Sequence, residues 1–376
     1  MPHELARRLL RVEEHERPHR DRWGNWEFGF CEAYRRGMLW VPEIDLWLAE
    51  HRPSGESLWP DARSFAVCLT HDVDLVSRRS TPRQALRSMR LSFAAGAGSA
   101  RGQAIRLARP GVRAARALAN GISTAPAADT LELCVDIEQK LGVAASYFFT
   151  VYPGGSGHRY DCTYDFADSC RFRGRRLRIA DVIRALHDEG FDVGLHGSYN
   201  SALEPGLLRR EKAALEDAVG FAVATTRQHF VHWDPAMTPR RQVEAGFSAD
   251  STLGFNRNLG FRAGTSLPYR MFDLLRNEPT GLLEVPLIVH DGALLRSDAL
   301  ELGVELALET LRGLLESIRE VGGLATVVFH PNNLARPDYL ALFEATIAYG
   351  VEHRAWFASL RDLDAWWRER EARGRS

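Results

Sequence analysis

The sequence predicts an α/β protein in which parallel strands and helices alternate around a closed or nearly closed barrel. From residue 130 onward, apolar segments of strand length alternate with amphipathic segments of helix length, which indicates β/α units and a parallel sheet. About six to eight such units fit in the chain, and that number favours a barrel over an open sheet. The 376 residues can bury one large core or the cores of two smaller domains.

The elements of the main domain follow from the period of the apolar residues and from the turn residues between them. Strands are predicted at 65–70, 144–152, 191–196, 225–230, 247–252, 282–290 and 324–330. Helices are predicted at 130–142, 179–190, around 204–219, 239–246, 299–320, 337–350 and 359–371, and a polar loop at 154–178.

Residues 1–60 are predicted to form a tryptophan-rich extension that packs on the main domain, itself expected at 61–370. The extension contains the sequences WGNWEFGF and LWVPEIDLWLAEH. The spacing of Ile44, Trp47 and Leu48 after Pro42 predicts a short amphipathic helix.

An arginine-rich helical insertion is predicted at 77–128. Between Asp74 and Asp129 the chain has ten arginines and no acidic residue. Such a block can dock on an acidic polymer or on anionic lipid headgroups at a membrane surface. A solvated basic face is the simpler interpretation and is favoured, because a charge block alone is weak evidence of a partner.

The composition is typical of a globular protein, with 45% hydrophobic and 26% charged residues and a formal net charge of −1. This balance argues against a whole-protein nucleic-acid binder. No apolar run reaches the roughly 18 residues of a membrane span, and residues 1–20 lack the apolar core of a signal peptide, so we expect a cytoplasmic protein. The five cysteines form no CxxC pair, and reduced thiols are expected.

The stretch FAVCLTHDVD, residues 65–74, ends a buried strand in a polar tip. If the chain stays extended there, Asp72 and Asp74 point the same way, because side chains alternate along a strand. Two such carboxylates can hold a metal ion, share a proton, or act separately as ligand and base. An acidic turn without chemistry is the simpler alternative.

Polar residues also follow the other predicted strands. In β/α barrels the working residues lie at the carboxyl ends of the strands, so these side chains are expected at one rim. They are Asp72, Asp74, His196, Arg227, His229, Asp250, His290, Asp291 and His330.

The order of five sequence segments resembles the motifs of the polysaccharide deacetylase family, also called the NodB-homology group or carbohydrate esterase family 4. These segments are THDVD (70–74), GLHGSYNS (194–201), TRQHF (226–230), ADSTLGF (249–255) and VVFHPNN (327–333). The resemblance covers roughly residues 64–368. It implies a distorted (β/α)7 TIM-like barrel and a metal-dependent hydrolase that removes N-acetyl groups from glycans.

Carried over by position, the resemblance assigns the catalytic roles. Asp72 matches the general base, and Arg227 matches the arginine that keeps this base ionised. His330 matches the general acid, and Asp250 would hydrogen-bond its far ring nitrogen. Phe255 stands where the family often has a tryptophan, and Thr326 and Val328 alter the apolar acetyl pocket.

The implied cofactor is a divalent metal ion, with Zn²⁺ expected and other divalent ions left open. Asp74 would be the carboxylate ligand and His196 the first imidazole. The second imidazole position, four residues later, is Asn200, which departs from the family. Either Asn200 ligates weakly, or His229 supplies the third ligand, or metal binding is degraded and the protein is no longer an enzyme.

The sequence therefore predicts an N-deacetylase that acts on an N-acetylated carbohydrate or a glycan precursor. Two alternatives stay open. One is a metal-dependent hydrolase of a small non-peptide amide on the same fold, because the 158–178 loop could close over a small ligand. The other is a non-catalytic glycan-binding relative.

Overall fold

The chain is seen in a computed structural model, in which residues 1–51, 57–76, 84, 86–87, 90, 130–151 and 155–374 are described. The predicted insertion at 77–128, and with it any contact with a lipid surface or acidic polymer, lies almost entirely outside the described residues. In the described part of the chain, no helix is both long and apolar enough to cross a membrane.

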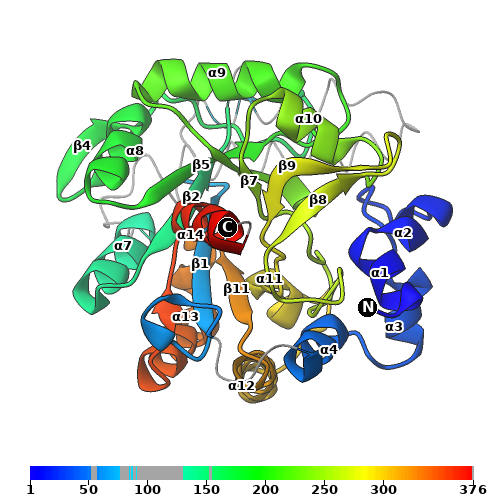
Figure 1. Cartoon of the computed structure of the whole chain (residues 1–376). Coiled ribbons are helices and arrows are strands. Elements are labelled where there is room, and N and C mark those ends of the chain that lie inside the picture. The colour runs from blue at the N-terminus through cyan, green and yellow to red at the C-terminus, as the bar shows by residue number, and fades with distance from the viewer. Residues whose placement is uncertain are drawn as a thin grey trace.

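A mostly parallel sheet forms the centre of the molecule, which confirms the predicted α/β class (Figure 1). Its strands follow the order β10-β11-β1-β2-β5-β6-β7-β9-β8, and β12 (Trp356–Phe357) pairs with β1. Only β8 and β9 pair antiparallel among these described strands. The strands are β1 (Ala66–Val73), β2 (Ala145–Phe149), β5 (Asp192–Gly197), β6 (Thr225–Gln228), β7 (Ala249–Asp250), β8 (Tyr269–Asp273), β9 (Glu278–Glu284), β10 (Val289–His290) and β11 (Leu324–Phe329).

Helices surround this sheet in Figure 1 because each buries one apolar stripe against it. In α8, the buried residues Ile179, Val182, Ile183 and Leu186 recur at the spacing of one helix face. The surrounding helices are α7 (Thr130–Leu141), α8 (Ile179–Asp188), α9 (Leu207–Val219), α10 (Thr238–Glu244), α11 (Asp291–Leu295), α12 (Val304–Glu320) and α13 (Pro337–Glu352).

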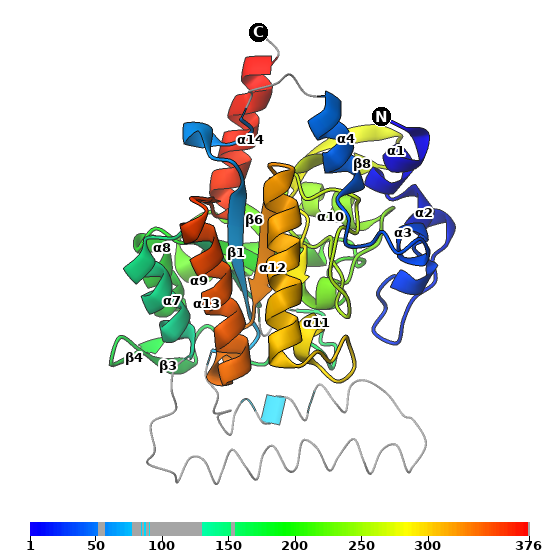
Figure 2. The same ribbon diagram turned by 90° about the horizontal axis from the view of Figure 1, so that it is seen from below.

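Helix α14 (Leu360–Gly374) covers the amino end of the sheet. Its residues Leu360 and Leu363 share an apolar cluster with Ala66 and Leu324, the first residues of β1 and β11. Figure 2 shows α14 extending from this end. The carboxyl ends of the parallel strands, where the predicted site residues lie, are at the opposite end.

A closed barrel is not seen, because the predicted strand at 282–290 is broken into two strands. Its first part belongs to β9, which pairs with β7, and its last two residues form β10, which pairs with β11. Pro286 lies between them and has no N–H for a ladder. Single hydrogen bonds bridge the break, from Leu287 N to Leu253 O (3.0 Å) and from Ile288 N to Thr326 O (3.0 Å).

The predicted loop at 154–178 contains a hairpin of β3 (Ser169–Phe172) and β4 (Arg175–Arg178) that the sequence did not predict. Arg173 and Gly174 both have positive φ, 52° and 70°, as the two central residues of a tight hairpin turn require. These strands carry arginines and lack the alternation of apolar and polar residues that usually indicates a strand.

Four helices of the extension gather on one side of the molecule in both views (Figures 1 and 2). Only α4 (Glu43–His51) was predicted; the others are α1 (His3–Leu9), α2 (Val12–Glu16) and α3 (Glu32–Arg35). Buried charges join this segment to residues 254–267. Glu14 is fully buried between Arg11 and Arg262, and Asp45 Oδ2 accepts a hydrogen bond from Ser266 N at 2.8 Å.

A buried polar network fixes strand β1 just before the site. Glu138 accepts a hydrogen bond from the Tyr147 hydroxyl (2.6 Å), and its Oε1 forms a second hydrogen bond with His71 Nε2 (2.6 Å). The other ring nitrogen of His71 donates to the carbonyl of Phe329 (3.1 Å). All three side chains are buried, so every polar atom depends on its partner.

Replacing Glu138 by alanine is therefore expected to lower the free energy of unfolding by about 3–5 kcal/mol, because two buried polar groups lose their partner. Urea unfolding measures this change. The control is Lys140→Ala on the exposed face of the same helix, expected to change stability by less than about 0.5 kcal/mol. Equal losses in the two variants would contradict the assigned role.

Candidate metal centre and active site

Six of the predicted residues meet in a cavity of about 70 Å³. They reach it from the ends of β1, β5, β6, β10 and β11, because the carboxyl ends of parallel strands share one edge of the sheet. The lining residues are Asp72, Asp74, His196, His229, Phe230, Val231, Asn256, His290, Arg296 and His330.

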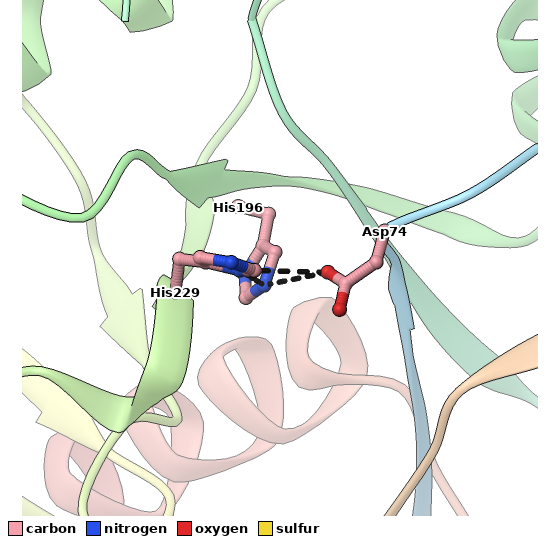
Figure 3. A group of neighbouring side chains, drawn as sticks. All are labelled: Asp74, His196 and His229. Carbon is pink, nitrogen blue, oxygen red and sulfur yellow. Dashed lines mark hydrogen bonds and ion pairs between the residues drawn. The ribbon is translucent and has the colours of Figure 1, made fainter. Parts of the chain in front are cut away.

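The nitrogen atoms of two imidazoles face the same carboxylate (Figure 3). His196 donates its Nδ1 hydrogen to the carbonyl of Arg227 (3.0 Å), which leaves the lone pair on Nε2. His229 donates its Nε2 hydrogen to the carbonyl of Tyr160 (2.8 Å), which leaves the lone pair on Nδ1. These two nitrogens lie 2.9 Å apart, and each is 3.4 Å from Asp74 Oδ1.

This arrangement calls for a cation. Two lone pairs that face one another at this distance repel unless a proton or a metal ion lies between them. Asp74 supplies the opposing charge: burial acts to raise its pKa, but His229, His196 and His330 hold that pKa well below its usual range. Burial likewise acts to lower the pKa of His229, and Asp74 raises it above its ordinary value.

The donor set fits a divalent metal. Two neutral imidazoles and one carboxylate are a ligand set of catalytic zinc sites, which keep a further position open. The separations allow one ion to contact all three atoms at about 2.0–2.2 Å, the usual zinc distances. Backbone carbonyls hold the second nitrogen of each imidazole, as is usual for metal-binding histidines.

The backbone after His229 is strained. Phe230 and Val231 follow it with φ of 61° and 49°, in the left-handed region that a β-branched residue such as valine rarely adopts. They belong to a short turn, His229–Val231, that ends strand β6. Strain of this kind persists where the surrounding structure imposes it, and it clusters at functional sites.

Asn200 is placed elsewhere. It is not among the residues that line the cavity in the described part of the chain. Its backbone carbonyl accepts hydrogen bonds from Leu203 N and Glu204 N, both 2.9 Å, so the chain turns at this position. Of the two candidates for third ligand, the structure brings His229 to the cluster.

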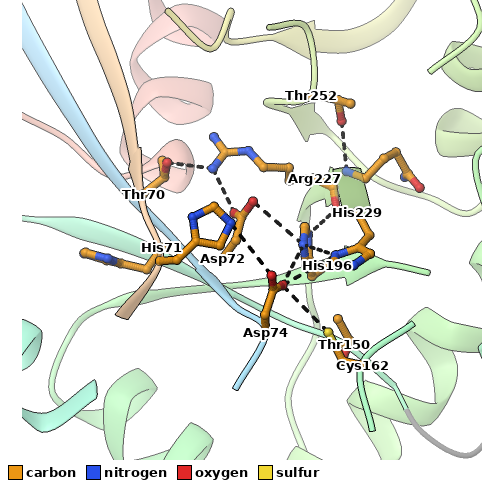
Figure 4. Close-up of polar contacts among 12 residues, drawn as sticks. Thr70, His71, Asp72, Asp74, Thr150, Cys162, His196, Arg227, His229 and Thr252 are labelled. Carbon is orange, nitrogen blue, oxygen red and sulfur yellow. Dashed lines mark hydrogen bonds and ion pairs between the residues drawn. The ribbon is translucent and has the colours of Figure 1, made fainter. Parts of the chain in front are cut away.

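Asp72 lies against a fully buried arginine (Figure 4). Arg227 Nη1 donates to Asp72 Oδ1 (3.0 Å) and to Thr70 Oγ1 (2.7 Å), and the other side of the guanidinium is held by Ser251. Burial acts to raise the pKa of Asp72, but Arg227 and then His196 lower it below the ordinary value. Asp72 is thus a carboxylate that can accept a proton.

His330 has a different partner from the predicted one. Its Nδ1 donates to Asp291 Oδ1 (2.8 Å), and its backbone N–H donates to Asp291 Oδ2 (2.9 Å). Burial acts to lower the pKa of His330, but Asp291 outweighs it and raises that pKa to about 10. The other ring nitrogen faces the cavity, 3.8 Å from Asp74 Oδ2.

The prediction that Asp250 contacts His330 is therefore wrong. Strand β7 places Asp250 opposite Glu284 on β9, and Thr252 donates to its Oδ1 (2.6 Å). Burial and the nearby Asp250 raise the pKa of Glu284 well above its usual range, so the two carboxyl groups share a proton. Asp291 also follows a predicted strand end, so the same sequence signal would have indicated it as the partner of His330.

Arg296 and Asn256 also line the cavity, although no sequence signal marked them. Arg296 donates to Asn256 Oδ1 (3.1 Å) and forms an ion pair with Asp298 (3.0 Å). His290 is neutral, because burial and the charge of His330 lower its pKa to about 3.

Of the residues expected in the acetyl pocket, Val328 packs with Val231 and Leu287 in a small apolar cluster, and Val231 lines the cavity. Thr326 lies two residues before Val328 on strand β11 and is also buried. Phe255 packs instead with Trp26 and Leu39 of the extension.

No protein-family model matches the sequence, and no curated protein is significantly similar to it. A crystal structure from Mycobacterium smegmatis, provisionally described as a polysaccharide deacetylase, matches with a TM-score of 0.54 and 20% identity over 83% of this chain and 93% of that one. A mutant of a carbohydrate esterase family 4 pseudoenzyme with restored activity matches with a TM-score of 0.38 and 11% identity over 81% and 69%. The chain thus shares the fold of the M. smegmatis protein, a mixed α/β fold with a mostly parallel sheet.

Proposed function

We propose that the protein is a metal-dependent hydrolase that removes N-acetyl groups from a carbohydrate or a glycan precursor. One observation carries the proposal: the cluster of Asp74, His196 and His229 has a carboxylate, Asp72, 3.7 Å from His196 and an imidazole, His330, 3.8 Å from Asp74. The fold shared with a protein described as a polysaccharide deacetylase supports it.

The cluster Asp74, His196 and His229 would hold the metal, and zinc suits its donors. The chemistry such an ion supplies is Lewis-acid activation of a water molecule and of the acyl carbonyl. Asp72 would accept the proton of the attacking water, since Arg227 keeps it ionised. His330 would donate a proton to the departing amine nitrogen, since Asp291 keeps it protonated.

The size of the cavity agrees with this assignment. At about 70 Å³ it is far below the roughly 300–1,000 Å³ of a site that encloses a drug-sized ligand. It can take an acyl group and a water molecule, and a sugar ring would remain outside.

We also infer that the sheet is a distorted seven-stranded barrel. Its strands would be β1, β2, β5, β6, β7, the broken pair β9 and β10, and β11. The support is that residues 278–290 pair with β7 at one point and with β11 further along the same segment.

The proposal is tested by acetate release from N-acetylglucosamine oligomers with zinc-loaded protein. Release from a small amide but not from any oligomer would favour the small-amide alternative. Stoichiometric zinc without any turnover of either substrate would favour the non-catalytic alternative.

The pair of Asp291 and His330 predicts a specific pH dependence. With a pKa of about 10, His330 is protonated throughout the neutral range, so activity should fall on the alkaline side only near that value. The same pair stabilises the fold fully below pH 6.5, the ordinary pKa of histidine, and this contribution is lost as the pH rises through about 10.

Asp291→Asn is expected to lower kcat/KM at pH 8 by about 100-fold, with a smaller loss at pH 6, because burial then lowers the pKa of His330. Profiles of kcat/KM against pH measure the shift. The control is Asp250→Asn, which should keep the alkaline limb of the wild type. An unshifted limb in Asp291→Asn would remove His330 from the role of acid.

A further inference from the structure

A second pocket, of about 480 Å³, lies beside the cavity and is lined largely by the amino-terminal extension. Its volume falls in the range of about 300–1,000 Å³ that is usual for ligand sites. Phe28, Tyr34 and Trp40 line it from the extension, and Arg257, Asn258 and Asp298 line it from the main domain.

Neighbouring residues of the chain line this pocket and the candidate active site. Asn256 lines the cavity, and the next two residues of the chain line the pocket. Arg296 lines the cavity and forms an ion pair of 3.0 Å with Asp298, which lines the pocket. A molecule that fills the pocket therefore lies next to whatever enters the cavity.

Aromatic faces and polar groups alternate around the pocket. Tyr34 is 44% exposed and Trp40 is 40% exposed, although both are large and apolar enough to be buried. Trp40 Nε1 donates to Asn258 Oδ1 (3.3 Å), which fixes the orientation of the indole. The guanidinium of Arg257 lies 5.4 Å from the ring centre of Phe28.

This lining suits a sugar ring. The C–H groups on one face of a pyranose carry partial positive charge and pack on the electron-rich face of an aromatic ring. The hydroxyl groups at its edge need donors and acceptors held in fixed positions, which guanidinium, amide and carboxylate groups provide. Ion pairs hold the charged groups in place, since Arg257 pairs with Glu27 at 2.8 Å and Asp298 with Arg296 at 3.0 Å.

We propose that this pocket is a carbohydrate subsite, which binds a sugar unit next to the one whose acetyl group enters the cavity. The inference rests on the proposed function and deepens it. It gives the substrate class as an oligosaccharide or polysaccharide rather than a monosaccharide, and it assigns a role to the tryptophan-rich extension.

The test measures the binding of N-acetylglucosamine hexamer by titration calorimetry. Every protein in this assay carries Asp72→Asn, which prevents turnover. Trp40→Ala and Tyr34→Ala are each expected to weaken binding at least about 10-fold, in line with the loss of an aromatic anchor. The matched control is Phe30→Ala. Phe30 is 40% exposed in the same extension but stacks on His19, outside the pocket, and its removal should leave the affinity unchanged.

Kinetic measurements on the same variants in proteins that keep Asp72 give a second readout. The variants should raise KM for the hexamer while leaving kcat/KM for the monosaccharide unchanged. Trp40→Phe, which keeps a ring with little risk to folding, should fall between the wild type and Trp40→Ala.

The outcomes separate the subsite from the reaction. Hexamer binding that depends on Trp40 and Tyr34, in a protein that releases no acetate, would uphold the subsite and reject the deacetylase. Equal affinity in Trp40→Ala, Tyr34→Ala and Phe30→Ala would overturn the subsite even if acetate is released. Failure of the starting protein to bind the hexamer at all would overturn it as well.

Discussion

Replacing Asp72 by asparagine is expected to reduce acetate release from N-acetylglucosamine oligomers by about 10²–10⁴-fold, the usual contribution of a general base. Asparagine has nearly the same shape but cannot accept the proton of a water molecule. Its amide oxygen can still accept the hydrogen bond from Arg227 that Asp72 Oδ1 receives at 3.0 Å. The fold should therefore persist while the chemical step fails.

Metal content distinguishes this loss from damage to the neighbouring cluster. Asp72 is not one of the three clustered ligands, so Asp72→Asn should bind zinc as the wild type does. The control is Asp192→Asn, a buried aspartate at the first residue of β5, at the other end of the sheet from the cavity. Full activity in Asp72→Asn would remove Asp72 from the role of base.

Local patterns were enough for most of the fold. The apolar period of 3.6 in α8 and the apolar runs of β1 and β11 are properties of a few neighbouring residues, and the structure confirms these elements. The split of the segment 282–290 depends on which strands lie on either side of it. That is a relation between distant parts of the chain, and only Pro286 hinted at it.

The candidate site shows the same division. Strand ends identified the residues that meet in the cavity, because parallel strands bring their carboxyl ends together. Pairings between those ends could not be derived, and so Asp250 was chosen where Asp291 makes the contact. The position of His229 depends on the left-handed backbone at Phe230 and Val231, and no pattern of residue types predicts that conformation for a valine.

The third ligand has the clearest test. Replacing His229 by alanine is expected to lower zinc affinity at least about 100-fold, because two protein ligands then remain where catalytic zinc sites use three. Asn200→Ala is the matched control and should bind zinc as the wild type does, since Asn200 is not among the described residues that line the cavity. Metal content after dialysis and calorimetric titration with Zn²⁺ measure both variants.

Thermal unfolding separates a lost ligand from a lost fold. Without metal, His229→Ala should be less stable than the wild type, because it loses the hydrogen bond to the Tyr160 carbonyl (2.8 Å) and leaves Asp74 without one of its imidazole partners, so each variant is compared with itself in the presence and absence of zinc. With zinc, the wild type and Asn200→Ala should gain stability as a tightly bound ligand requires, and His229→Ala should not. If Asn200→Ala loses zinc while His229→Ala keeps it, the ligand assignment is reversed. If the wild type binds no zinc at all, a proton rather than a metal ion holds the two histidines and the carboxylate together, and the non-catalytic alternative is favoured.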